Sequence, residues 1–115
     1  MAERLKVKKN DGVWIVQFAD RKILDELCIM EIQEELSRVV ESNTGGDLLL
    51  SFKGVEHLSS AALGMLITLK KKVEENNGKL KLSDINPQIF EVFKITRLNK
   101  VFDIHSSAAE AQASF

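Results

Sequence analysis

Cysteine and histidine are scarce in this sequence, and their scarcity argues against several kinds of site. Cys28 is the single cysteine, so no disulfide can form within the chain. Small secreted domains usually carry several disulfides, and this composition therefore fits a reducing cytosol best. The histidines are His57 and His105, and neither a CxxC pair nor an HxxxH spacing occurs. We therefore expect no metal site.

A charge excess of one sign is also missing, as is any long apolar run. The 16 basic and 17 acidic residues give a net charge of −1, which supplies no long-range attraction to nucleic-acid phosphates. The longest uncharged stretch, residues 58–69, includes two serines and a threonine. It is much shorter than the roughly 20 apolar residues of a membrane-spanning helix, and no apolar stretch of signal-peptide length follows the basic N-terminus. We expect a cytoplasmic protein that binds no nucleic acid and has no membrane span.

Sequence motifs for nucleotide binding and catalysis are absent as well. There is no glycine pattern of the Walker or Rossmann type, so we expect no nucleotide site and no cofactor. A nucleophile elbow requires Gly-x-Ser-x-Gly, whereas Ser60 has Leu58 two residues before it and Ala62 two residues after it. His57 lies near Ser60 and could in principle act as a base, but a single loop histidine is more often solvated. We expect no catalytic residue. Of three hypotheses about function, the hypothesis that the chain is an enzyme is the least favoured.

What is present is the patterning of one ordinary α/β domain. Apolar residues make up 44% and charged residues 29% of the 115 residues, values typical of a chain that folds around one core. No linker divides the chain, so we expect a single domain over residues 1–115. The predicted elements, in chain order, are strands at 4–9 and 13–18, a helix at 24–41, a strand at 48–50, a helix at 60–75, a strand at 79–82, a helix from Pro87, a strand at 101–104 and a short helix from Ser106-Ser107 through Ala113.

Turn signals and apolar spacing support this order. Asn10-Asp11-Gly12 joins the first two strands as a hairpin, and the polar cluster at 42–46 ends the first helix. The run Leu48-Leu49-Leu50 suits a strand covered on both faces. In the first helix, Leu24 and Leu27 belong to an apolar set at helical spacing that should pack against the sheet. The pattern predicts an α/β fold with a mixed sheet, an N-terminal hairpin and about four helices packed against it.

Two adjacent serines, Ser59 and Ser60, stand where a strand exit meets the start of a helix. Serine is a favoured N-cap because its oxygen accepts a hydrogen bond from an orphan amide, so a purely structural role is one interpretation. The same helix end offers free amides and a partial positive charge that suit an added phosphate. A phosphoserine adds about −1.5 to −2 charges at neutral pH, and Ser60 could therefore be a switch.

Two segments are distinctive, residues 47–69, DLLLSFKGVEHLSSAALGMLITL, and residues 92–104, VFKITRLNKVFDI. With the order of elements, they resemble the STAS domains of bacterial anti-sigma-factor antagonists along nearly the whole chain. The first segment resembles the family's strand, phosphorylation loop and following helix, and the second resembles its closing helix, turn and strand. The family loop commonly reads Asp-Ser-Ser/Thr-Gly-Leu-Gly. Aligning its Leu-Gly with Leu63-Gly64 places the phosphoacceptor serine at Ser60, with Ser59 in place of the preceding aspartate.

The resemblance implies a partner switch rather than a reaction. The unphosphorylated antagonist would bind an anti-sigma factor that is also a serine kinase, which releases the sigma factor, and phosphorylation of Ser60 would end the binding. The ATP belongs to the kinase. The surface that the resemblance implies for partner binding consists of His57, Leu58, Ser59, Ser60, Ala61, Leu63 and Gly64.

A second hypothesis is a STAS scaffold subunit of a larger assembly, either sensory (stressosome-like) or lipid-transporting. In that case Ser60 would be a structural cap and would never be modified. The sequence leaves open whether the chain forms a homodimer, and it does not identify the kinase, the sigma factor or the triggering signal.

Overall fold

The structure is a computed structural model that describes residues 5–10, 12–42 and 46–115. Its main sheet has five strands in the order β1-β2-β4-β6-β7. These strands are β1 (Leu5–Asn10), β2 (Val13–Phe18), β4 (Asp47–Ser51), β6 (Leu80–Ser83) and β7 (Asp103–His105). The first two pair antiparallel as the predicted hairpin, and the other neighbours are parallel, so the predicted mixed sheet is confirmed. Residue 4, Asp11 and residues 43–45, which belong to the predicted hairpin and helix stop, lie outside the described residues.

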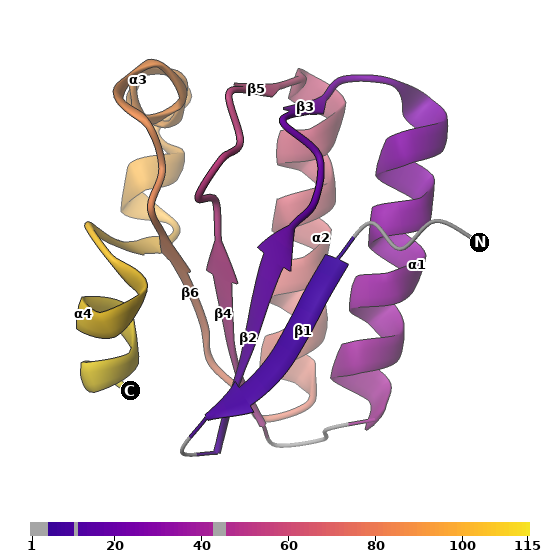
Figure 1. The fold of residues 1–115 in the computed structure, drawn as a ribbon, viewed down its shortest axis with the longest axis vertical. Helices are drawn as coiled ribbons and strands as arrows, with labels where there is room; N and C mark the ends of the chain where they lie inside the picture. The colour runs from indigo at the N-terminus through magenta and orange to yellow at the C-terminus, as the bar shows by residue number, and fades with distance from the viewer. Residues whose placement is uncertain (1–4, 11, 43–45) are drawn as a thin grey trace.

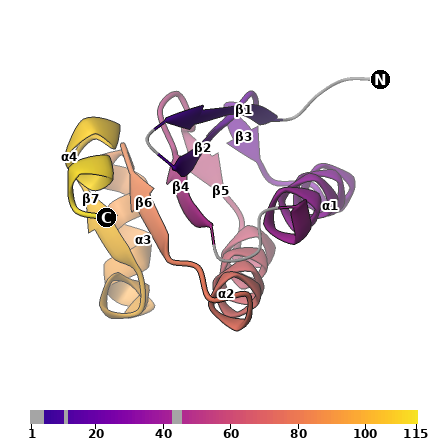
Figure 2. The same ribbon diagram turned by 90° about the horizontal axis from the view of Figure 1, so that it is seen from below.

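Helices cover both faces of this sheet (Figures 1 and 2). The helices α1 (Glu26–Ser42), α2 (Ser60–Glu75) and α3 (Pro87–Ile95) contribute to the main core on one face. The short helix α4 (Ala108–Ala113) lies on the other face, where Ala111 packs with apolar side chains of β2 and β4. Within the described ranges, no helix is both long enough and apolar enough to cross a membrane.

The strand β4 is central, as the run Leu48-Leu49-Leu50 predicts. Leu50 lies in the main core opposite Val16 of β2 and Leu82 of β6. Leu49 points to the other face, where it packs in the smaller cluster with Ala111. Both leucines are completely buried because successive side chains of a strand alternate between two covered faces.

The buried stripe of α1 differs from the predicted one. Leu24 and Leu27 are 50% and 63% exposed, so the prediction that they pack against the sheet is wrong. The buried residues of the helix are Cys28, Ile29, Ile32, Leu36 and Val40. A residue on an α-helix is turned by about 100° from its neighbour, so a stripe that runs through Ile29 and Ile32 leaves Leu27 outside, and Leu24 precedes the helix altogether.

The last predicted strand begins two residues too early. Residues 101 and 102 instead complete a turn after a short 3₁₀-helix, η1 (Leu98–Lys100), in which Phe102 N donates to Leu98 O over 2.9 Å. Pairing with β6 begins at Asp103. The sequence pattern also misses β3 (Lys22–Ile23) and β5 (His57–Leu58), which pair with each other, because a two-residue strand is too short to show alternation.

A polar cluster on the α4 face links the last two strands to the end of the chain. Lys81 is nearly buried, and its Nζ lies 2.6 Å from Asp103 Oδ2 and 5.1 Å from the centre of the Phe115 ring. His105 Nε2 lies 2.9 Å from the other oxygen of Asp103. The hydrogen bond from Lys81, supported by His105, holds the pKa of Asp103 below its ordinary value, although partial burial opposes the shift.

This cluster predicts a pH-dependent contribution of Asp103 to stability. Because its pKa is lower in the folded chain, the stabilisation is present above the unfolded-state pKa and is lost as the pH falls through the folded-state pKa. Asp103 is half exposed, so solvent screening limits the effect. We expect Asp103→Asn to lower the free energy of unfolding at pH 7 by up to about 1 kcal/mol in urea titrations, and the difference to shrink as the pH falls through the lowered pKa of Asp103.

The matched control is Glu91→Gln, which removes an exposed pair with Lys94 on α3. We expect it to change stability less than Asp103→Asn does, since both of its partners are at least half exposed. Equal stability of Asp103→Asn and the parent chain at pH 7 would show that the Lys81 contact contributes nothing.

Candidate functional site

The loop that leads from β4 to α2 is anchored by buried apolar side chains. Phe52 and Val55 are almost completely buried, and Phe52 stacks at an angle against Phe18 of β2 with ring centres 5.0 Å apart. Between Phe52 and Val55 in the sequence, Gly54 has a φ of +88°, a conformation that glycine adopts without steric cost. The chain therefore turns sharply after β4 and runs along a defined path toward Ser59.

The small ladder between β3 and β5 holds the residues just before the helix. Ile23 is paired with Leu58, and Ser59 N donates to Ile23 O over 3.1 Å. The carbonyl of Arg21 accepts from the amides of both Glu56 and His57, at 2.6 Å and 3.2 Å. These bonds fix the backbone up to the first residue of α2.

An exposed ion pair lies beside this ladder. The Arg21 guanidinium donates to a carboxylate oxygen of Glu56 through two nitrogens. This hydrogen bonding and the positive charge of Arg21 hold the pKa of Glu56 below its ordinary value. Glu56 is therefore charged near neutral pH and accepts hydrogen bonds from Arg21, whose positive charge balances its own.

Asn86 ties the same loop to the start of α3. Its Oδ1 accepts from Ile89 N over 2.8 Å, which caps α3 as the Asn86-Pro87 signal predicts. Its Nδ2 donates to the carbonyls of Val55 and Glu56, at 3.1 Å and 3.4 Å. The sequence carries a signal for the cap but none for the bond to the loop, because the loop is 30 residues away along the chain.

Ser59 and Ser60 have different structural roles. Ser59 is the N-cap of α2: its backbone is extended, and its Oγ accepts from Ala62 N over 3.2 Å. Ser60 is the first residue of the helix, its side chain is exposed, and its hydroxyl has no hydrogen-bond partner among the described residues. The capping function therefore belongs to Ser59, and the side chain of Ser60 is exposed.

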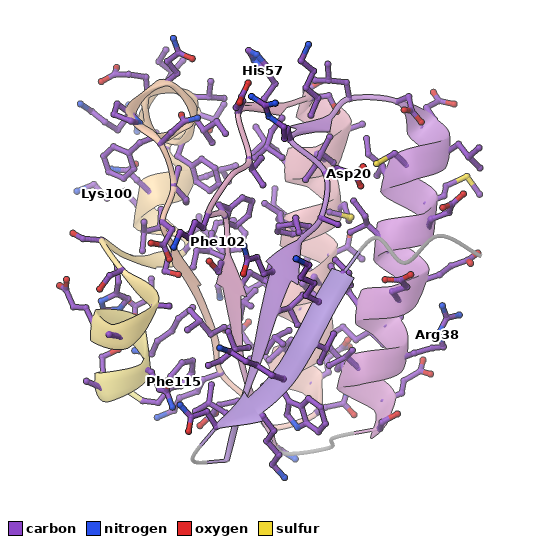
Figure 3. The ribbon with its side chains drawn as sticks, in the orientation of Figure 1. Asp20, Arg38, His57, Lys100, Phe102 and Phe115 are labelled. Atoms are coloured by element: carbon purple, nitrogen blue, oxygen red, sulfur yellow. The ribbon has the colours of Figure 1, made fainter. Side chains whose placement is uncertain are left out.

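The predicted partner-binding residues divide into an exposed set and a buried one. Ser60, Ala61 and Gly64 are exposed on the first turns of α2, and His57 is exposed beside them at the end of the molecule opposite Phe115 (Figure 3). Leu58 and Ser59 are half-buried. Leu63 is only 6% exposed and packs in the main core. It lies beneath the predicted surface because residue 63 falls on the sheet-facing stripe of α2.

Three of these exposed residues, Ser60, Ala61 and Gly64, have a small side chain or none. Apart from its chain neighbours and the backbone of its own helix, nothing lies within 4 Å of a Cβ added at Gly64, so this turn of the helix is open. Thr68, one turn further, folds its hydroxyl back onto Gly64 O over 3.2 Å. A partner can therefore approach the backbone of α2 closely around Ser60, and we call the exposed residues His57, Ser60, Ala61 and Gly64 the Ser60 surface.

The Ser60 surface presents an exposed hydroxyl at the first residue of α2. Residues at the start of a helix lie beside amides that have no intrahelical partner and carry a partial positive charge. In the part of the chain that the structure describes, no three His, Cys, Asp or Glu side chains gather to hold a metal ion. The sequence pattern carries no signal for the residues that hold the loop in place. These residues are Arg21, Ile23, Glu56 and Asn86, the last of which is predicted only as the cap of α3.

Comparisons with known proteins agree with this architecture. The anti-sigma-B factor antagonist of Bacillus subtilis (strain 168) is 28% identical over 102 residues, which cover 89% of this chain and 90% of that protein. A solved structure of an anti-sigma-factor antagonist (STAS) domain protein from Planctomyces limnophilus superposes with a TM-score of 0.87 at 20% identity over 96% of each chain. The Bacillus cell fate determinant SpoIIAA, solved in the phosphorylated form, superposes with a TM-score of 0.70 at 11% identity, covering 96% of this chain and 99% of that one.

Both structural likenesses concern the fold alone, whereas the family assignment comes from the sequence. The characteristic pattern of the STAS domain extends over residues 4–111. Because that match takes in nearly every element from the hairpin to α4, the chain belongs to the STAS domain family.

Proposed function

We propose that this chain is an anti-sigma-factor antagonist controlled by phosphorylation of Ser60. In its unphosphorylated form it binds an anti-sigma factor that is a serine kinase, and the sigma factor is released. The kinase uses its own ATP to phosphorylate Ser60, which ends the binding. We place this exchange in the cytoplasm, where a sigma factor acts. The chain itself catalyses nothing.

The observation that carries this proposal is that Ser59 and Ser60 have different structural roles. Ser59 Oγ already accepts a hydrogen bond from the amide of Ala62. Modification of Ser60 therefore does not remove the cap of α2. The Ser60 hydroxyl is exposed at the first helical position, where a kinase can reach it. A phosphate there is favoured by the helix dipole, so the fold can tolerate the modification while the surface changes.

The physical effect of the phosphate is on the interface. None of the residues of the Ser60 surface is acidic, and the charge of the nearby Glu56 is paired with Arg21. Adding a group of about −1.5 to −2 charges to a close-packed interface costs desolvation and repels acidic groups of the partner. A loss of 1.4 kcal/mol already weakens binding about tenfold.

The first test concerns Ser60 itself. We expect Ser60→Ala to keep affinity for the co-encoded anti-sigma kinase but to abolish labelling with ATP, and Ser60→Asp to weaken affinity at least about tenfold. Mass spectrometry after incubation with the kinase and ATP locates the phosphate, and titration calorimetry measures the affinity. Phosphate on Ser59, or full affinity of the chain phosphorylated at Ser60, would favour the scaffold hypothesis instead.

The second test concerns Ser59, which stands where the family usually has aspartate. Aspartate is an equally good N-cap, and its charge at the helix start is favourable by about 0.3 to 1 kcal/mol. We expect Ser59→Asp to raise the melting temperature slightly and to speed phosphorylation of Ser60. An unchanged or slower initial rate would show that the kinase does not require the carboxylate.

Ser59→Ala separates the cap from the phosphorylation site. We expect it to lower the free energy of unfolding by about 1 kcal/mol while Ser60 is still labelled. The matched control is Ser107→Ala, which removes the equivalent cap of α4, where Ser107 Oγ accepts from Glu110 N over 3.1 Å. That variant should also be destabilised, but its labelling rate should equal that of the parent chain.

A further inference from the structure

The start of α1 carries an exposed apolar ridge. Leu24, Leu27 and Met30 are 50%, 63% and 57% exposed. They are spaced three residues apart, so they follow one another along the outer side of the helix and the residues before it. The core contacts of α1 are made by other residues, such as Ile29 and Ile32, so these three side chains are not needed to hold the helix on the sheet. We call them the Leu27 ridge.

Acidic residues border the Leu27 ridge along the chain, and the basic residues Lys22 and Arg38 stand at the two ends of this acidic stretch. Residues 24–37 contain five acidic side chains and no Lys, Arg or His. Glu26 and Glu34 are exposed and lie one turn from Met30 on either side along the helix. A complementary surface must therefore combine an apolar groove with a rim of Lys or Arg. A second copy of this chain does not meet that requirement through the same face, because two acidic rims would oppose each other.

The Leu27 ridge is continuous with the Ser60 surface. Leu24 directly follows Ile23, whose carbonyl accepts from Ser59 N over 3.1 Å. The first turns of α1 and α2 therefore lie at the same end of the molecule, which Figure 1 shows beside β3 and β5. In Figure 3, His57 lies at this end, whereas Arg38 lies further along α1, where it lines a hollow together with Met30 and Glu34. A partner seated on Ser60 at this end would also meet the ridge.

We infer that the Leu27 ridge is a second contact of the partner-binding surface and that it fits a basic-rimmed apolar groove on the same protein that contacts Ser60. This inference rests on the proposed function and adds a binding element to it. The Ser60 surface is where modification controls binding, whereas the Leu27 ridge supplies apolar area and charge complementarity. Burial of these exposed apolar side chains against a partner removes apolar area from water, which favours association.

The test compares two double variants with a matched control by titration calorimetry against the co-encoded anti-sigma kinase. We expect Leu27→Gln with Met30→Gln to weaken binding at least about tenfold. The control, Ile95→Gln, removes an apolar side chain that is 78% exposed on α3, and its affinity should equal that of the parent chain. Glu26→Gln with Glu34→Gln should weaken binding at low salt and reduce the dependence of affinity on salt.

The outcomes separate this inference from the proposed function. If the parent chain does not bind the kinase, the proposed function fails and the inference fails with it. If the parent chain binds and the Leu27, Met30 variant binds equally well, only the ridge is disproved. A parent chain that sediments as a dimer, and a Leu27, Met30 variant that sediments as a monomer, would assign the ridge to a second copy and overturn the inference. Circular dichroism melting checks that each variant is folded, as the exposure of both side chains predicts.

Discussion

The burial of β4 on both faces is the constraint on which the rest of this structure depends. Its neighbours β2 and β6 run parallel to it, so the chain must cross over a face of the sheet between strands. Each crossover leaves at the carboxyl ends of the strands. The starts of α1 and α2 consequently gather at one end of the molecule, and the Ser60 surface lies there for that reason.

Hydrogen bonds between neighbouring segments then fix the backbone of the site more precisely than the sheet does. The carbonyls of Arg21 and Ile23 hold the backbone from Glu56 to Ser59, and Asn86 holds the carbonyl of Val55 from the other side. These contacts come from segments on both sides of the loop in sequence. They place Ser59 in the extended conformation that an N-cap requires and leave the side chain of Ser60 exposed on the first turn of α2.

The proposed function depends on surfaces rather than on reacting groups. The small residues at the start of α2 would permit close approach of a partner, and a single phosphate there would oppose it. The adjacent Leu27 ridge has the opposite character, since it is apolar, projecting and bordered by acids. A partner that fits both must match shape at one and charge at the other, which would give specificity as well as control.

Patterns along the chain were sufficient to predict the element order, the central place of Leu48 to Leu50, the cap at Asn86 and the location of Ser60 at a helix start, because each depends on neighbouring residues. They failed where distant segments decide the outcome. Leu24 and Leu27 share the apolar spacing of α1, yet the orientation of the helix on the sheet turned Ile29 and Ile32 inward instead. The burial of Leu63 likewise depends on how α2 packs on the sheet, and its predicted part in partner binding stays a prediction. The ladder between β3 and β5 and the bond from Asn86 to Val55 leave no trace in the sequence pattern, since only tertiary structure brings their partners within hydrogen-bonding distance.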